Sequence, residues 1–241
     1  MKLSIIVPHF NEGENLINFC EYISQINFLK EFEVLFVDDY SNDESKISSS
    51  KLAKSYSQLR FLDNKFDKGL GGTIRSGILE SKGDFVAIMM CDSSDNLEDL
   101  EKYYKEIQAN NFDAILGSRF TEGSKIKNYP FRKLILNRIF NYFVKIIFWS
   151  NYNDFTNAFK IYKKKALLDI MPLVSESFNI FLEIPLKIIS RQLKYKIIPI
   201  SWENKRIGKS NFKIQELGSK YFFTLIYCFF EKSLIIKRKK K

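Results

Sequence analysis

The sequence predicts an α/β fold in which a mostly parallel sheet is flanked by helices. Short apolar runs such as Phe85–Met90 alternate with longer segments of helical length along the chain, which is typical of βαβ units. The run Phe85–Met90 is apolar without interruption, as expected of a strand that is buried on both faces. In addition, polar turn residues follow most of these runs directly, so each strand has a clear end.

The elements follow in order. Pro8 ends the first strand, and a glycine-rich loop at 67–72 begins a helix that continues to about 81. We expect right-handed crossovers between parallel strands. The expected strands are 3–7, 33–37, 59–62, 85–90, 113–116 and 196–202. Two of the expected helices end near 26 and 81, and the others span about 44–56, 97–108, 132–149 and 178–193.

Composition limits the class of protein. The chain has 241 residues, of which 45% are hydrophobic, enough for one large domain or one domain with an appendage. The net charge of +10 indicates anionic partners: nucleic acid, phosphorylated small molecules or a membrane surface. Three scattered cysteines without a CxxC pair fit a reducing cytosol. We expect neither a signal peptide nor a membrane-spanning stretch of roughly 20 apolar residues.

Polar residues gather at the ends of four expected strands. In a parallel sheet these ends share one edge, where α/β proteins bind ligands. Asp92 and Asp95, with serines between them, suit a hard divalent cation that also holds a diphosphate. Alternatively, Asp92 or Ser94 ends the strand in a turn, and Asp95 or Asn96 caps the helix that begins near Leu97. The clustering favours the cation site. The residues at the four ends are Asn11 and Glu12, Asp38 and Asp39, Asp92 and Asp95, and Ser118 and Arg119.

Two loops have compositions that suit phosphate. Gly69, Gly71 and Gly72 follow the third strand, so they do not match a dinucleotide-binding fingerprint, and the chain has no GxxxxGK[ST] loop. Gly71 would still allow a ligand to approach the backbone closely. A tight turn is the alternative explanation for these glycines, and for Gly69 it is the preferred one. In the loop at 204–211, Arg206 and Lys209 stand on either side of a glycine, which favours either phosphate binding or a solvated turn.

Two apolar segments suit a membrane surface. The helix expected at 132–149 is apolar over a wide arc, contains basic residues and ends in Trp149, which favours an interfacial helix over a core helix. The end of the chain combines aromatic residues at 221–230 with the basic run 237–241, which would bind an anionic leaflet unless it is a solvated tail. We therefore expect one main domain at 1–212, which includes the interfacial helix at about 132–149, and a membrane-associating tail at 213–241.

Seven motifs, in order, resemble family-2 glycosyltransferases with the GT-A fold, and more narrowly the polyprenyl-phosphate glycosyltransferases of the dolichyl-phosphate mannose synthase type. They are SIIVPHFNEGENL, EVLFVDDYSNDES, the glycine loop, CDSSDN, ILGSRF, DFTNAFK and KRIGKSNF. Each motif is weak alone, but their order along nearly the whole chain is specific. The resemblance implies a Rossmann-like GT-A domain with interfacial helices.

The resemblance also implies roles for single residues. Asp92 matches the second acid of the family's DxD motif, Met90 stands where the first acid would be, and Asp95 is the candidate substitute. Mg²⁺ or Mn²⁺ is the implied cofactor, with Asp92 and Asp95 as ligands. Catalysis is assigned to Asp92, Arg119 and Arg206: a cation on Asp92, with Arg119 or Arg206, would stabilise the charge of the leaving diphosphate. The implied substrate-binding residues are Pro8, Phe10, Glu12, Asp38, Asp39, Asp154, Lys209 and Ser210. For Asp154, a structural cap is the alternative.

The implied reaction is sugar transfer, with inversion, from a nucleoside diphosphate sugar to a polyprenyl phosphate. The implied partners are these two substrates and the anionic inner face of the cell membrane, to which the protein would bind peripherally from the cytoplasm. Nucleic acid is not an expected partner. Whether the protein forms a homo-oligomer is left open. One alternative is a family-2 enzyme of envelope polysaccharide synthesis that uses a glycan or another lipid as acceptor. Another is a non-catalytic membrane or nucleic-acid binder, which the acidic cluster disfavours.

Overall fold

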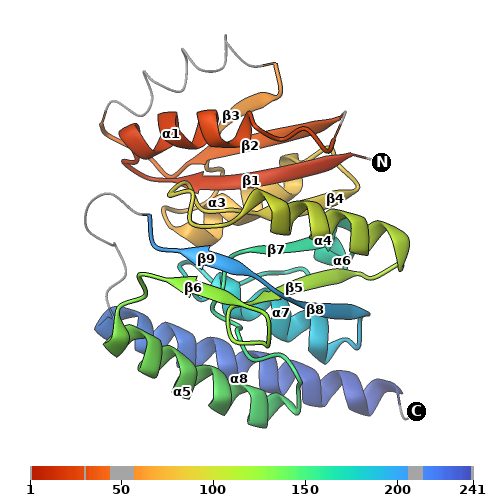
Figure 1. Ribbon diagram of the computed structural model, residues 1–241. Coiled ribbons are helices and arrows are strands. Elements are labelled where there is room, and N and C mark those ends of the chain that lie inside the picture. The colour runs from red at the N-terminus through yellow and green to blue at the C-terminus, as the bar shows by residue number, and fades with distance from the viewer. Residues whose placement is uncertain (1, 30, 44–56, 206–213, 240–241) are drawn as a thin grey trace.

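The computed structural model describes residues 2–29, 31–43, 57–205 and 214–239. Within these ranges, seven strands form one sheet that is parallel except for β7, which runs against both of its neighbours (Figure 1). This confirms the predicted α/β class. Across the sheet the strands are β3 (Leu59–Asp63), β2 (Phe32–Asp38), β1 (Leu3–His9), β4 (Phe85–Ile88), β7 (Lys160–Lys163), β5 (Ala114–Ser118) and β8 (Tyr195–Pro199).

Helices cover both faces of the sheet because its strands are apolar on both sides. On one face, Phe19 and Leu100 come from α1 and α4 and pack in one buried cluster with Ile5 of β1. On the other face, Ile74 and Ile184 come from α3 and α7 and pack in a second cluster with neighbours from α6. The bounds are α1 Gly13–Ile23, α3 Leu70–Glu80, α4 Leu97–Ala109, α6 Lys164–Asp169 and α7 Ile180–Ser190.

The predicted strand at 196–202 is wrong in one respect, because it is divided between two sheets. Its first part is β8, and its last part, β9 (Ser201–Glu203), pairs with β6 (Lys125–Lys127) in a separate two-stranded sheet. Ile200 lies at the junction, where its N–H donates to Ser118 and its carbonyl accepts from Lys125. The two bonds therefore direct the chain from one sheet into the other. The helix predicted at 44–56 lies outside the described residues.

Two long helices, α5 (Phe131–Phe148) and α8 (Ile214–Lys239), lie side by side beyond the second helical layer (Figure 1). The rings of Phe140 and Tyr221 meet edge to face at 5.5 Å, and those of Phe148 and Phe229 at 6.4 Å. The helices therefore run parallel. Tyr221, Leu225 and Cys228 are buried in the main core, so the segment predicted as a tail packs onto the domain along α8.

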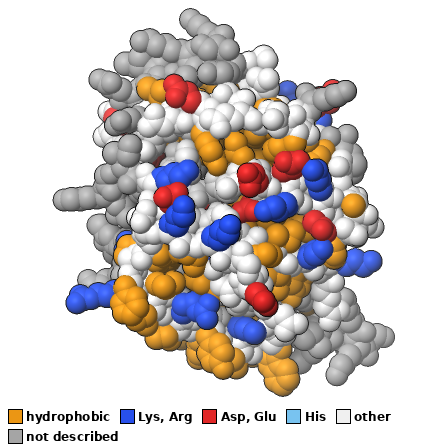
Figure 2. Space-filling model, in the orientation of Figure 1, with side chains coloured by type: hydrophobic (Ala, Val, Ile, Leu, Met, Phe, Trp, Pro, Cys, Tyr) orange, Lys and Arg blue, Asp and Glu red, His pale blue; other side chains and the backbone are white. Residues whose placement is uncertain are grey.

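Helix α5 has an unusual distribution of side chains, with a polar residue facing inward and apolar residues facing outward. Asn141 is buried and accepts a hydrogen bond from the backbone N–H of Phe155 (2.6 Å). Figure 2 shows hydrophobic side chains along the lower edge of the molecule, with Lys and Arg among them. The large side chains of α5 that are exposed are Phe131, Ile135, Leu136, Ile139, Tyr142, Phe143 and Ile146, and Trp149 follows, 92% exposed.

Helix α8 adds exposed Phe222, Phe223, Phe229, Phe230 and Leu234 beside these residues. Isolated exposed apolar residues are normal in soluble proteins, but many of them on two adjacent helices are typical of a binding surface. We call the outward apolar side chains of α5 and α8 the apolar face. None of the helices within the described ranges is long and apolar enough to cross a bilayer.

Candidate active site

The parallel strands place the predicted residues at one edge of the sheet. Asp38 ends β2, Asn11 and Asp92 follow β1 and β4, and Arg119 follows β5. Because β7 is antiparallel, its first residue, Lys160, lies at this same edge, opposite Ile88 and Leu116. We call this region the carboxyl edge.

The backbone takes up rare conformations at this edge. Asn11, Tyr40 and Ser93 have φ angles of 53°, 59° and 53°, in the left-handed region that residues other than glycine rarely occupy. Each follows one of the three adjacent strands β1, β2 and β4. Backbone strain of this kind persists where the surrounding structure enforces it, and it is common at ligand sites.

Asp39 connects the second strand to the glycine loop. Its Oδ1 accepts hydrogen bonds from Asn64 Nδ2 (2.9 Å) and from the backbone N–H of Gly69 (2.8 Å). Its own N–H donates to the carbonyl of His9 (2.9 Å), which ties the ends of β1 and β2 together. The predicted contact of Asp39 with a nucleoside would therefore come from a carboxylate whose position is already fixed.

Asp38 lies beside the only histidine of the chain. Its carboxylate accepts the backbone N–H of Ser41 (3.1 Å to Oδ2), and its Oδ1 is 3.5 Å from His9 Nδ1. Burial lowers the pKa of His9, although Asp38 acts in the opposite direction. His9 is therefore neutral at pH 7 and lies beneath the site rather than acting as a proton donor in it.

The other residues predicted to bind the nucleoside lie at the end of β1. Pro8 is buried within the strand, and Phe10 is half-buried with the ammonium of Lys68 3.9 Å from its ring centre. Glu12 is at the start of α1 and its side chain accepts from Asn15. Of these, Phe10 offers an accessible aromatic surface.

The loop after β4 contains one accessible and one buried acid. Asp92 is half-buried and accepts the N–H of Ser94 (3.1 Å), whereas Asp95 is 4% exposed. Burial, with a smaller effect of the charge on Asp92, raises the pKa of Asp95 to about 8, so it is protonated at neutral pH. Asn96 caps α4 through Glu98 N–H (2.7 Å), so the alternative prediction of a helix cap also holds.

This loop fits a cation bound mainly by the substrate. Within the described ranges, no group of three or more His, Cys, Asp or Glu side chains could hold a metal ion. Mg²⁺ often binds through one or two carboxylates plus substrate phosphates, and Asp92 supplies such a carboxylate. Asp95 would have to lose its proton to contribute. The donor set therefore fits a cation shared with a diphosphate, and not a site built by protein alone.

Arg119 and Asp154 form a buried ion pair. Arg119 Nε and Nη2 donate to Asp154 Oδ2 and Oδ1 at 2.9 and 2.7 Å, and the backbone N–H of Arg119 adds a third bond at 2.9 Å. Arg119 is 8% exposed and Asp154 fully buried. Burial favours a lower pKa for Arg119, but Asp154 outweighs it and raises the pKa. An acceptor could reach Asp154 only if this pair opened.

Three residues that sequence reasoning did not single out complete the edge. Burial lowers the pKa of Lys160 to about 7, although Asp154 acts against this, and its Nζ donates to the carbonyls of Phe155 and Asn157. Trp202 bridges to Asp95 through the backbone. Tyr22 donates to the Asp95 carbonyl at 2.8 Å. Lys160 belongs to the motif DFTNAFK. Nothing in the sequence indicated that Trp202 and Tyr22 contact the backbone of Asp95.

The glycine loop packs against the protein itself. A Cβ on Gly71 would lie 1.9 Å from the carbonyl oxygen of Ser175, and one on Gly69 would lie 2.3 Å from that of Glu176. Gly69 also has a φ of 148°. The close approach predicted for Gly71 is therefore made by the segment at 175–176.

The last predicted group, Arg206, Lys209 and Ser210, lies outside the described residues. The chain is described up to Lys205, whose Nζ is 5.5 Å from the ring centre of Tyr22. Since Tyr22 binds the Asp95 carbonyl, the loop starts close to the acidic residues.

Comparison with known proteins finds relatives among sugar transferases. The chain is 33% identical over 136 residues to dolichol-phosphate mannosyltransferase of Pyrococcus furiosus, covering 56% of this chain and 38% of the relative. It is 28% identical over 225 residues to dolichyl-phosphate beta-glucosyltransferase of Saccharomyces cerevisiae, covering 83% of this chain and 66% of the relative. The chain thus spans less than two thirds of either relative.

Solved structures share the fold. Glucosyl-3-phosphoglycerate synthase from Mycobacterium tuberculosis, in complex with Mn²⁺, UDP and glucosyl-3-phosphoglycerate, superposes with a TM-score of 0.72 at 12% identity and covers 94% of this chain and 79% of that one. The same enzyme with Mg²⁺ and UDP gives 0.70. These likenesses confirm the predicted GT-A fold. The model of the family described as "Glycosyl transferase family 2" matches residues 4–171, more than half of the chain, and the chain therefore belongs to that family.

Proposed function

We propose that this protein transfers a sugar, with inversion, from a nucleoside diphosphate sugar to a polyprenyl phosphate at the cytoplasmic face of a membrane. The observation that supports it best is the presence of an acidic ligand edge and a broad apolar face on one molecule. The first suits a nucleotide-sugar with its cation, and the second suits a lipid surface. The two curated relatives are named for dolichol-phosphate and dolichyl-phosphate acceptors.

The donor would bind along the ends of β1, β2 and β4. Phe10 would offer its ring to the base, and Asp39 would meet the nucleoside, with Asp38 and the glycine loop beside it. The diphosphate would lie at Asp92. A divalent cation, Mg²⁺ or Mn²⁺, held by Asp92 and the diphosphate, would neutralise the charge of the leaving group.

The acceptor needs no strong base. A phosphate monoester has a second pKa near 6, so it is mostly a dianion at neutral pH. One of its oxygens attacks the anomeric carbon from the side opposite the diphosphate, a new C–O bond forms, and the bond to the diphosphate breaks with its electron pair. No proton has to move. The protein would act by positioning and by charge, with Arg206, Lys209 and Ser210 as the proposed phosphate contacts.

The apolar face supports the membrane part of the proposal. Exposing the rings and aliphatic chains of α5 to water is unfavourable, whereas at a lipid surface the same side chains lose their contact with water. Basic residues on α5, including Arg132, Lys133 and Arg138, would meet anionic headgroups. Lys237–Lys241 extends this basic character at the end of the chain.

A donor screen tests the proposal. The purified full chain is incubated in detergent with undecaprenyl phosphate and each common nucleotide-sugar, with Mn²⁺ or with EDTA. We expect transfer from at least one donor and most of it lost in the Asp92→Asn variant, while Glu101→Gln, which removes a surface carboxylate from α4, keeps it. Transfer to a glycan and not to undecaprenyl phosphate would support the alternative acceptor class. Full activity in Asp92→Asn would refute the assigned role of Asp92.

A further inference from the structure

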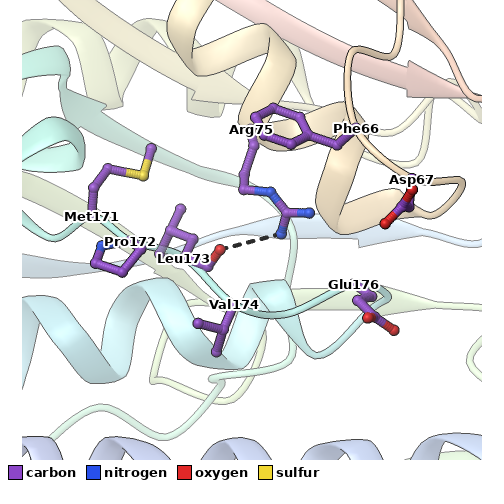
Figure 3. A pocket seen from close by; sticks show the side chains of 8 residues that line it. All are labelled: Phe66, Asp67, Arg75, Met171, Pro172, Leu173, Val174 and Glu176. Atoms are coloured by element: carbon purple, nitrogen blue, oxygen red, sulfur yellow. Dashed lines mark hydrogen bonds between the residues drawn. The ribbon is translucent and has the colours of Figure 1, made fainter.

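The glycine loop rests on a short segment that precedes α7. The carbonyl of Glu176 accepts the backbone N–H of Gly71 at 2.9 Å. Arg75 of α3 donates through Nη1 to the carbonyls of Ser175 (2.6 Å) and Leu173 (3.3 Å). Figure 3 shows Arg75 pointing at this segment, and both line a pocket of about 610 Å³. We call residues 173–176 the supporting segment.

Two glycines of the loop lie so close to the backbone of this segment that neither position has room for a side chain. As described above, a side chain at Gly69 or Gly71 would overlap the carbonyls of Glu176 and Ser175. The distance between the loop and the supporting segment is therefore fixed by backbone contact. A displacement of the supporting segment would move the loop, because no flexible side chain lies between them.

The supporting segment is in turn held by a buried carboxylate. Glu183, in the first turn of α7, has no exposed surface, and it accepts backbone N–H bonds from Val174 (2.9 and 3.1 Å) and Ser175 (2.7 Å). A carboxylate only accepts, so it matches consecutive N–H donors, whereas an amide would turn an N–H group toward one of them. Lys187, 3.4 Å from Glu183, donates to the carbonyl of Pro172 just before the segment.

The same contacts lead to the donor side of the site. The N–H of Gly69 donates to Asp39 Oδ1, so the position of the glycine loop and that of the Asp39 carboxylate are connected. We propose that Glu183 is a positioning residue for the nucleotide donor: it holds the supporting segment, which seats the glycine loop against Asp39. This inference rests on the proposed function, because it assumes that a nucleotide binds at Asp39.

Nucleotide affinity of the Glu183→Gln variant tests the proposal. UDP, GDP and CDP are titrated into the full chain, and the tightest binder for the unmodified protein is used throughout. We expect its Kd to rise about tenfold in Glu183→Gln, equal to about 1.4 kcal/mol. The KM for undecaprenyl phosphate and kcat at saturating donor should change less than about threefold, because neither depends on the loop. Glu176→Gln is the matched control, since its side chain is exposed and pairs with Lys220 at 3.4 Å on the surface.

A second variant separates positioning from general loss of stability. Gly71→Ala pushes the loop away from the same segment, so it should also raise the Kd. If both changes act through one contact, the double variant should bind about as weakly as the weaker single variant, whereas independent effects would multiply. Amide exchange at Val174 and Ser175 should be faster in Glu183→Gln. Should that variant not fold, Gly71→Ala alone decides.

The outcomes are distinct. If the unmodified protein binds a nucleotide and both variants bind it equally well, the positioning role is refuted and the proposed function stands. If Glu183→Gln only lowers the melting temperature while its folded fraction keeps the original Kd, the role is structural and the proposal is wrong. If the unmodified protein binds none of the three nucleotides, the proposed donor site and the positioning role both fail.

Discussion

Replacing Asp154 by Ala should destabilise the protein strongly, because it would leave the guanidinium of Arg119 buried without its counter-ion. Three hydrogen bonds disappear at once, two from the guanidinium and one from the backbone N–H of Arg119. Removing one partner of a buried ion pair typically costs about 3–5 kcal/mol.

The surroundings of Arg119 place the expected loss at the lower end of this range. The rings of Phe120, Tyr129 and Trp202 lie 5.4, 5.5 and 5.6 Å from the guanidinium carbon, within reach of a cation–π attraction that remains after the substitution. We therefore expect a loss of about 3 kcal/mol. In a domain of this size each kcal/mol lowers Tm by about 2–4 °C, so Tm should fall by roughly 6–12 °C.

Urea and thermal unfolding of the full chain measure this loss. The double variant Arg119→Met with Asp154→Leu serves as the comparison, because it removes both charges and keeps apolar volume. It should be more stable than Asp154→Ala alone. A loss below about 1 kcal/mol in Asp154→Ala would refute the reasoning, since it would mean that the pair is not a buried structural contact and that Asp154 is available to a substrate.

Three further predictions concern charge, the apolar face and the acceptor. Burial lowers the pKa of Lys160 in the folded protein to about 7. Between about pH 7 and 10, this side chain is therefore protonated in the unfolded chain and mostly neutral in the folded protein. The free energy of unfolding should therefore rise with pH in this window, and Lys160→Met should flatten the rise; identical slopes in both proteins would count against it. Phe143→Glu, on the apolar face, should weaken binding to anionic liposomes without lowering Tm, whereas Leu79→Glu, equally exposed on α3, should leave binding unchanged; equal losses in the two variants would contradict the membrane role of α5. Arg206→Lys should lose about tenfold in transfer rate although it keeps the charge, because Lys lacks the bidentate fork, and Arg206→Ala should lose more; transfer at the unmodified rate in Arg206→Ala would leave that loop without a role.

The position of the candidate site at one edge of the sheet was predictable, because the carboxyl ends of parallel strands lie at the same edge. Asp38, Asp39 and Asp92 could be grouped from their positions after apolar runs, with no knowledge of contacts. The hydrogen bonds that hold Asp39 in place were not predictable in the same way. The bonds from Asn64 and Gly69 to Asp39 connect residues 25 and 30 positions apart, and no local pattern encodes them.

The roles of single residues depended on pairings that the sequence does not reveal. Arg119 and Asp154 were each predicted as ligand contacts, yet they are 35 residues apart and bind each other. Asp95 looks like Asp92 in the sequence, and only burial distinguishes the protonated acid from the accessible one. The strand β7 was missed since its four residues, KIYK, begin and end in lysine and lack a strand's apolar run.

That strand determines when the fold can be completed during synthesis. β4 and β5 never pair with each other, because β7 lies between them and pairs with both. A nascent chain that ends before Lys160 would hold β4 with an open side, and β5 would have no partner until β7 and β8 follow. Open strand sides are sites of mispairing and aggregation. We therefore expect the first two thirds of this chain to need protection on the ribosome, and truncations before residue 163 to aggregate.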